Sequence, residues 1–432
     1  MALRLSASDS SFPEAFDLLV NARREADADV SADVAAIIKD VRSNGDEALS
    51  RLTQKFDGHD LDFTGWQVSA LECEAALEGL EPNLRIALEL AAIRIRDYHE
   101  GQKPDNRDYR DDADVRIGAR WNAVERAGIY IPGGRAAYPS SVLMNAIPAK
   151  VAGADRIIMV TPTPGGEVNP LVLAAAQIAG VDEIWRIGGA QAVAALAFGT
   201  EKIKPVDVIT GPGNAWVAEA KRQVYGVVGI DMVAGPSEIV VVADGKNDPD
   251  WIAADLLSQA EHDPTSQSIL FTDDAAFAGA VATQIEKQLG ELATSKTATQ
   301  SWNDNGAIIL VDRLEKAMPL VDRLAAEHLE LACDDPQALF DKVRHAGSVF
   351  LGRHTPEAVG DYVAGPNHVL PTGRRARFSS GLSVTDFMKR TSFLECDAAA
   401  LEKIGPAAVA LAEAEGLPAH AASVQKRLDT RR

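Results

Sequence analysis

The chain has 432 residues, more than one hydrophobic core ordinarily organises, so at least two domains are expected. Hydrophobic residues make up 46% of the sequence and charged residues 25%, the balance of a globular protein in water. The formal net charge of −20 argues against binding to nucleic acid or anionic membranes, because both require a cationic surface.

The N-terminal residues, MALRLSASDSSFPEAF, lack the apolar stretch of a secretion signal, and no later run reaches membrane length. We therefore expect a cytoplasmic protein. Cys73, Cys333 and Cys396 lie far apart and form no CxxC pair, as in proteins of a reducing compartment. Cys333 follows His328 closely, but no second residue type supports a catalytic thiol there, and the sequence leaves the cysteines' roles open.

The N-terminal part of the chain is predicted to be helical. Helices are expected at 12–26, at 30–56 with an interruption at Ser43-Asn44-Gly45, and at 77–101. The segment 103–119 is polar and rich in Asp and Arg, which predicts an exposed loop or an edge hairpin.

From Glu125 onward, short β-branched runs alternate with Ala-rich helical runs. This alternation predicts right-handed strand–helix–strand units around parallel sheets, and hence an α/β fold. Strands of a first sheet are expected at 127–131, 156–161, 183–187 and 206–210. Helices between and after them are expected at 140–153, 168–179, 190–199 and 213–225. Strands of a second sheet are expected at 238–243, 267–272, 306–311 and 348–351.

These changes of pattern predict four parts of the chain. An N-terminal helical segment would span 1–26, and an inserted α/β domain that binds a nucleotide would span 130–236. The flanking stretches 27–129 and 237–380 would together form a larger α/β domain. The last part, 381–432, predicts a small helical tail that is too short to bury a core, so we expect it to pack against something else, such as another subunit.

The stretch SQAEHDP closes a helix that is expected to begin near Asp248. Gln259 and His262 stand three residues apart, so on a helix both side chains face the same way. An amide oxygen and an imidazole nitrogen could then meet at one point, which suits a divalent metal, with zinc the leading candidate. Two such residues are also common as ordinary surface or capping groups, so the pair alone does not decide.

Three further residue clusters can bind a metal or move protons. Glu327 and His328 follow an apolar run from Leu314, which predicts a helix with both residues at its end. A carboxylate and an imidazole there could transfer protons near neutral pH. Asp361 precedes a GPNH turn, and His420 follows GLP. The alternative for each is an ordinary position at a helix end or in a solvated loop.

Three glycine-rich turns follow strands of the first predicted sheet: IPGGRAAYPSS, IGGAQA and TGPGNAW. Ligands of open parallel sheets bind at the carboxyl ends of the strands, where these turns lie. The turn 211–216 nearly matches the dinucleotide fingerprint, but Trp216 replaces its third glycine. Such turns need glycine whether or not they bind a ligand. Three of them on one sheet edge favour a phosphate-bearing cofactor.

Taken together, the motifs resemble those of the histidinol dehydrogenase family. The resembling segments occur in family order from about residue 30 to the end: GIYIPGG…YPSSVLM, IGGAQAVAALAFGT, ITGPGN, AGPSE, SQAEHDP, AEHLE, GDYVAGPNHVLPT, ARFSSGLSV and EGLPAHAASV. The resemblance implies an NAD-dependent enzyme with one zinc ion per subunit. It implies oxidation of L-histidinol to L-histidine through bound L-histidinal, in two hydride transfers, as the last stage of histidine biosynthesis. It also implies two nucleotide-fold-like domains and a homodimer with intertwined tails that share the active sites.

The resemblance also implies site residues, motif by motif. The zinc ligands would be Gln259, His262, Asp361 and His420. The proton-moving pair would be Glu327 and His328. Cofactor contacts would include Tyr130, Gln191 and Asn214. Substrate contacts would include Ser237, Gln259, His262, His328, Asp361, Glu415 and His420. The stretch 373–377 is more basic than the commoner family form, which leaves the structure of that loop open.

The chemistry agrees with this interpretation and leaves two rivals. Oxidising an alcohol to an acid needs one base for the alcohol and one for the water that hydrates the aldehyde, and a histidine and a carboxylate meet both needs. One rival is a paralogous dehydrogenase of another polar alcohol, although Glu415 favours a cationic amine. The other is a zinc hydrolase in which Glu327 would act on a metal-bound water, and the three glycine turns count against it.

Overall fold

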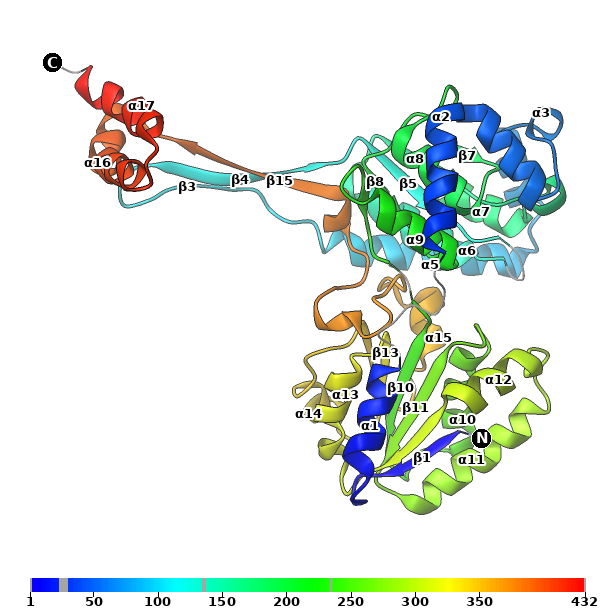
Figure 1. The fold of residues 1–432 in the computed structure, drawn as a ribbon. Helices are drawn as coiled ribbons and strands as arrows, with labels where there is room; N and C mark the ends of the chain where they lie inside the picture. Colours follow the sequence, from blue (N-terminus) through cyan, green and yellow to red (C-terminus); the bar gives the residue numbers. More distant parts are fainter. Residues whose placement is uncertain (1, 23–29, 134–136, 234, 431–432) are drawn as a thin grey trace. The chain divides into compact units, whose positions relative to one another are not determined.

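The computed structural model describes residues 2–22, 30–133, 137–233 and 235–430 (Figure 1). The chain divides into two compact units, one made of Met1–Gln102 with Glu125–Phe387 and the other of Lys103–Val124 with Met388–Arg432. The first unit contains two six-stranded sheets, and the second contains a three-stranded sheet. The predicted α/β class is confirmed. Within the described ranges, no helix is both long enough and apolar enough to cross a membrane.

The first sheet has the strand order β2-β7-β6-β5-β8-β9, and all of its strands are parallel except β2, which runs antiparallel to β7. Its strands are β2 (Gln67–Val68), β5 (Arg126–Tyr130), β6 (Arg156–Val160), β7 (Glu183–Trp185), β8 (Val208–Thr210) and β9 (Gly229–Ile230). Its helices are α2 (Ser31–Phe56), α3 (Leu61–Thr64), α4 (Ala70–Glu78), α5 (Pro82–Glu100), α6 (Pro139–Ala152), α7 (Pro170–Ala179), α8 (Gly189–Phe198) and α9 (Ala215–Val224). The expected interruption of the second helix is present as a kink at Gly45, whose φ is 49°.

The second sheet is entirely parallel and has the order β1-β12-β11-β10-β13-β14. Its strands are β1 (Leu3–Ser6), β10 (Glu238–Ala243), β11 (Gln267–Thr272), β12 (Ala307–Leu310), β13 (His328–Ala332) and β14 (Ser348–Leu351). Its helices are α1 (Phe12–Asn21), α10 (Pro249–Ala260), α11 (Ala275–Leu289), α12 (Ser295–Asn305), α13 (Met318–Leu324), α14 (Pro336–Phe340) and α15 (Glu357–Val359), and a π-helical turn, η3 (Gly360–Ala364), follows α15.

The two sheets share one topology. Taken in chain order, the five strands β5 to β9 are arranged third, second, first, fourth, fifth, and so are β10 to β14. In each sheet an N-terminal strand, β2 or β1, closes the edge beside the third strand. Each sheet therefore has a switch point where the strand order reverses, between β5 and β8 and between β10 and β13.

The sheets divide the chain differently from the predicted domains. β1 pairs with β12, and Phe16 of α1 lies in the core beside β10, so the N-terminal segment belongs to the second sheet. α2 belongs to the first sheet rather than joining 237–380, because Val34 shares a core with α8. Short strands and amphipathic helices carry no signal for which sheet will cover them, so the sequence pattern could not assign these segments. The predicted helix 12–26 ends at Asn21, and 23–26 lie outside the described residues.

The expected helix end at Glu327 and His328 is wrong. α13 stops at Leu324, Ala325 adopts a left-handed φ of 43°, and His328 begins β13 between β10 and β14. The strand HLELA is buried along its whole length. His328-Leu329-Glu330-Leu331 does alternate polar and apolar residues, but four residues directly after an apolar helical run are too few to separate a strand from the end of that helix.

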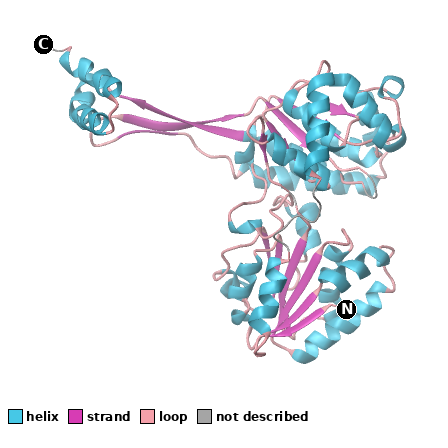
Figure 2. Cartoon of the chain, in the orientation of Figure 1, coloured by secondary structure: helices cyan, strands magenta, loops and turns pink. Residues whose placement is uncertain are grey.

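The second unit is a long antiparallel ribbon with two helices that follow its last strand (Figure 2). It consists of β3 (Arg107–Arg110), β4 (Arg116–Ala123), β15 (Met388–Glu395), α16 (Ala398–Ala414) and α17 (Pro418–Asp429). The expected edge hairpin is β3 with β4. The expected helical tail is present as α16 and α17, but the polar stretch before these helices forms β15, which pairs with β4 from Met388 to Glu395. Because β15 is mostly exposed, its sequence carries no buried-face pattern, and the strand is defined only by its pairing with β4.

Gly118 provides a test of this ribbon. A Cβ at this position would overlap the carbonyl oxygen of Arg107 and the ring of Phe393. We expect Gly118→Ala to destabilise the second unit by about 1–3 kcal/mol, the usual cost of overpacking. Gly279→Ala, in α11, is the matched control: no atom lies within 4 Å of the added Cβ, and it should stabilise by about 0.5–1 kcal/mol. Urea unfolding midpoints would measure both, and equal midpoints for the two variants would contradict the expectation.

Candidate active site

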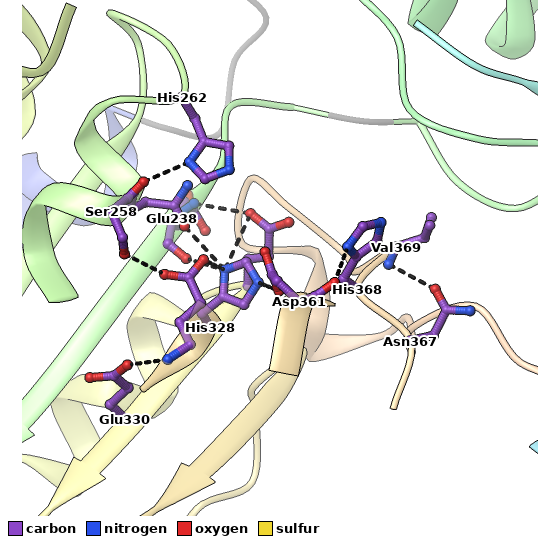
Figure 3. Close-up of polar contacts among 12 residues, drawn as sticks. Glu238, Ser258, His262, His328, Glu330, Asp361, Asn367, His368 and Val369 are labelled. Carbon is purple, nitrogen blue, oxygen red and sulfur yellow. Dashed lines mark hydrogen bonds and ion pairs between the residues drawn. The ribbon is translucent and has the colours of Figure 1, made fainter. Parts of the chain in front are cut away.

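His328 lies at the centre of a buried polar group at the amino end of β13 (Figure 3). Its Nδ1 atom is 3.1 Å from Oε1 of Gln259 and 3.3 Å from Oε1 of Glu357. The same nitrogen lies 3.2 Å from the carbonyl oxygen of Glu238, while Nε2 is 3.5 Å from Oδ1 of Asp361. The imidazole is therefore surrounded by acceptors on both of its nitrogens.

The charges around His328 determine its protonation. Burial favours the neutral imidazole, but the carboxylates of Glu357, Glu327 and Asp361 outweigh it and raise the pKa of His328 well above its ordinary value. Burial likewise acts to raise the pKa of Asp361, but the hydrogen bond and charge of His328 hold it below its ordinary value. Without another cation, His328 and Asp361 thus form an imidazolium–carboxylate pair.

Glu327 lies in the connection between α13 and β13, and its Oε2 is 3.8 Å from Nδ1 of His328. The N–H of Glu238, the first residue of β10, donates to the same oxygen over 3.1 Å. Burial raises the pKa of Glu327 to about 8. The two residues predicted to move protons are thus adjacent, buried and both held by the main chain of β10.

Gln259, His262 and Asp361 converge on this group from two segments. Gln259 is the last residue but one of α10 and is fully buried, whereas His262 lies just beyond the helix end and is exposed. Nδ1 of His262 is 2.8 Å from the carbonyl oxygen of Ser258, so its Nε2 is the nitrogen available to a ligand. Figure 3 shows the His262 ring near His328 and Asp361, and its charge acts on the Asp361 carboxyl group.

The donor set fits a divalent metal. His328, Glu357 and Asp361 each offer a ligand atom, and these atoms lie within 4.8 Å of one another. Among the described residues, Nε2 of His328 and Oε1 of Glu357 are buried without a hydrogen-bond partner. Carboxylate, amide and imidazole groups are zinc ligands, and a cation would offset the excess of buried negative charge.

Glu357 is a site residue that the sequence analysis missed. It lies in α15, four residues before Asp361 and on the same continuous helical segment, so both side chains reach the same side. Its N–H donates to Oε1 of Glu330 over 2.6 Å, and its Oε2 accepts from Oγ of Ser258 over 3.2 Å. Burial raises its pKa. The i to i+4 spacing of two acids beside a glycine is the signal that could have identified it.

The basic stretch 373–377 now has a defined structure. Arg374 has a left-handed φ of 67°, and its guanidinium is buried 3.1 Å from Oε1 of Glu238. It also donates to Oε1 of Gln267 over 2.6 Å. Because the main chain of Glu238 binds both catalytic candidates, this buried ion pair supports the strand that positions them.

The other candidates fall in separate places. Ser237 immediately precedes β10 at the amino end of the second sheet. Glu415 caps α16, and His420 is the third residue of α17; both are exposed and belong to the second unit, whereas Gln259 belongs to the first. Cys333 follows the carboxyl end of β13, opposite to His328, and burial raises the pKa of its thiol. Its position and pKa oppose a catalytic thiol.

The three cofactor candidates share one edge of the first sheet. Tyr130 ends β5, Gln191 lies in the first turn of α8, and Asn214 caps α9 by accepting from two main-chain N–H groups. The Tyr130 hydroxyl accepts from the N–H of Gly189 over 3.0 Å. Tyr130 and Asn214 therefore flank the switch point between β5 and β8, whereas Gln191 follows β7 on a helix whose start is bound to Tyr130. The N-cap residue of α8 is Gly188, which has no side chain, so apart from the bond of Gly189 to Tyr130 no capping side chain occupies this helix start, where a phosphate would fit.

The fold and site together define an α/β enzyme with a nucleotide-type binding edge on one sheet and an acid–base centre on the other. The family model for histidinol dehydrogenase matches residues 20–428. The chain is 65% identical over 429 residues to a histidinol dehydrogenase of Zymomonas mobilis, covering 99% of this chain and 100% of that protein. The histidinol dehydrogenase of Rhodospirillum rubrum is 60% identical over 430 residues and 99% of each chain.

A solved structure agrees with these matches. The crystal structure of histidinol dehydrogenase from Elizabethkingia anophelis has a TM-score of 0.94 and 37% identity, over 99% of this chain and 98% of that one. The chain therefore belongs to the histidinol dehydrogenase family and is an oxidoreductase enzyme. The family predicted from the sequence motifs is confirmed.

The role of Glu357 can be tested directly. Glu357→Gln removes one buried negative charge from the group around His328, so the site should hold a cation less firmly. We expect metal content after dialysis and turnover to fall by about 10–100-fold, the usual effect of altering a metal's supporting residues. Elemental analysis and initial rates would measure this. Glu286→Gln, an exposed carboxylate on α11, is the control, and a Glu357 variant with the control's metal content would contradict the role.

Proposed function

We propose that this enzyme oxidises L-histidinol to L-histidine through bound L-histidinal, as the last stage of histidine biosynthesis. Each substrate molecule would lose two hydrides to two NAD molecules, consume one water and release three protons. The observation that carries the proposal is the buried Glu327–His328 pair, with the carboxylate of Asp361 and the amide oxygen of Gln259 beside His328. Family membership supplies the substrate, since the relatives are named histidinol dehydrogenase.

Two bound groups would complete the site. Zinc, held by Gln259, His262 and Asp361 with His420 of the partner subunit, would supply a fixed positive charge that orients the substrate. NAD, contacted by Tyr130, Gln191 and Asn214, would supply the hydride acceptor.

His328 would act on the alcohol. To accept the hydroxyl proton it must be neutral, and in the ligand-free site the surrounding carboxylates keep it protonated. A bound cation would offset those carboxylates and so favour the neutral imidazole. Its contact with Oε1 of Gln259 at 3.1 Å fixes the plane of the ring. His328 would then take the hydroxyl proton as the hydride leaves carbon.

Glu327 would act on water in the second half of the reaction. The aldehyde must be hydrated before it can lose a hydride, so a base has to take a proton from water. The N–H of Glu238 fixes Oε2 of Glu327 at 3.1 Å, and a pKa of about 8 makes the carboxylate a stronger base than an exposed one. Ionised Glu327 would accept the water proton while the oxygen attacks the aldehyde carbon.

We further propose a homodimer in which the tails complete the partner's sites. The second unit leaves large apolar side chains uncovered: Leu394 is 72% exposed and Leu411 65% exposed. A second copy of the chain would cover them and bring in His420 and Glu415, with Glu415 facing the substrate amine. The three unpaired cysteines are consistent with a cytoplasmic enzyme.

The yield of NADH tests the reaction. We expect two NADH for each histidinol consumed, because alcohol and hydrated aldehyde are oxidised in turn. Absorbance at saturating NAD with a limiting amount of histidinol would measure it. A yield of one would show that the aldehyde is released, and no NADH would favour the zinc hydrolase. A panel of other amino alcohols would separate a paralogous dehydrogenase, which would prefer one of them.

The division of labour can also be tested. Glu327→Gln keeps the side-chain shape and removes the base, so oxidation of histidinal should slow by about 100-fold or more while the first hydride transfer slows far less. Single-turnover measurements starting from each substrate would separate the steps. An equal loss in both steps would show that Glu327 does not act on water alone.

Shared sites predict complementation between inactive variants. His262→Ala and His420→Ala homodimers should both be nearly inactive. When the two are unfolded, mixed equally and refolded, half of the dimers combine both chains and one of the two sites in each is intact. We expect about a quarter of wild-type activity if the sites act independently. Native mass spectrometry would confirm the mixed dimers, and no recovery despite their presence would exclude the shared site.

A further inference from the structure

A buried ion pair holds the glycine turn that follows β8. Lys221 of α9 and Asp231 pair with side chains that are 2% and 1% exposed. Nζ of Lys221 donates to the carbonyl oxygen of Gly211 over 2.9 Å, and Oδ2 of Asp231 accepts from the Gly211 N–H over 2.8 Å. Both main-chain polar groups of Gly211 are thus bound by the two members of one pair.

The pair connects three segments at the carboxyl edge of the first sheet. Asp231 directly follows β9, and its own N–H donates to Ile209 of β8 over 3.2 Å. Lys221 lies on the helix that the turn itself begins. Gly211 has a φ of 113°, and a Cβ there would overlap the carbonyl oxygen of Tyr130. The turn is therefore fixed against the end of β5 at the switch point.

Burying these two charges needs a reason. Removing a lysine and an aspartate from water costs free energy, and apolar side chains of similar size often stabilise a core equally well. Here the pair satisfies a main-chain N–H and carbonyl that lie beyond the end of the β8 ladder. Its effect is to define the conformation of the turn rather than to strengthen the sheet.

We propose that the Lys221–Asp231 pair is the positioning device of the dinucleotide-binding turn 211–214 and sets the affinity for the cofactor. The inference rests on the proposed NAD site. The turn leads directly to Asn214, whose Oδ1 accepts from the N–H groups of Trp216 and Val217. A shift at Gly211 would therefore move Asn214 and the start of α9 together. Glu327 and His328 lie on the other sheet, so their chemistry does not depend on this pair.

The test compares Lys221→Met with a matched control, Lys150→Met. Lys150 also pairs with an aspartate, Asp182, which accepts the N–H of Ile157 at the amino edge of the same sheet. We expect Lys221→Met to raise the Kd for NADH, from fluorescence titration, and the KM for NAD by on the order of tenfold or more, since the Gly211 carbonyl loses the Lys221 donor and the buried Asp231 carboxylate loses its cation. The turnover at saturating NAD and the KM for histidinol should stay within about twofold of wild type. Lys150→Met should change none of these values.

A second variant covers a failure of the first to fold. Lys221→Met/Asp231→Asn leaves no unpaired charge buried, yet Gly211 still lacks a donor for its carbonyl oxygen, so the same loss of NADH affinity is expected. Wild-type affinity in a folded single or double variant would overturn the proposal. An equal fall in turnover and in cofactor affinity would also overturn it, because that is the effect of general misfolding. Absence of NADH binding by the wild-type enzyme would instead refute the proposed cofactor, and with it the role of the pair.

Discussion

The structure depends on the burial of several carboxyl groups around one imidazole. Glu327, Glu357 and Asp361 all face His328. Buried carboxylates destabilise the folded protein unless each charge has a partner. The partners come from the main chain of β10, from α10 and from the segment after β14. Adjacent parallel pairing of β10 with β13 brings these groups together, so the sheet order is a requirement of the site.

The two sheets use the same strand order in opposite ways. In the first sheet, Tyr130 and the glycine turns lie at the carboxyl ends of the strands, the usual position for a ligand of an open parallel sheet. In the second sheet, His328 and Glu238 lie at the amino ends, where the C-terminus of α10 delivers Gln259. Under the proposed function, a shared topology would support cofactor binding on one sheet and acid–base chemistry on the other, and the side chains rather than the fold would decide which.

Buried ion pairs position both edges. Arg374 pairs with Glu238 beside the proposed catalytic pair, and Lys221 pairs with Asp231 beside the proposed cofactor turn. The main-chain N–H of Glu238 donates to Glu327, and the carboxylate of Asp231 accepts from the N–H of Gly211 in the proposed cofactor turn. Such pairs contribute little net stability compared with apolar packing, but they permit only one arrangement of the polar main chain around them. Their use here is consistent with sites that need fixed geometry more than additional stability.

The sequence by itself determined the family, the α/β class and most strands between 126 and 351, because β-branched runs and glycine stops mark these elements locally. It also named Glu327, His328, Gln259, His262 and Asp361 as site candidates, since motif spacing is a property of the chain. Only the tertiary structure decided that HLELA is a strand, that Leu3–Ser6 belongs to the second sheet, and that Glu357 joins the site. Each of these depends on which distant segment lies beside a residue, and elements this short carry no local pattern that would report it. The Lys221–Asp231 pair was undetectable for the same reason, because a buried ion pair between a helix and a loop has no local pattern.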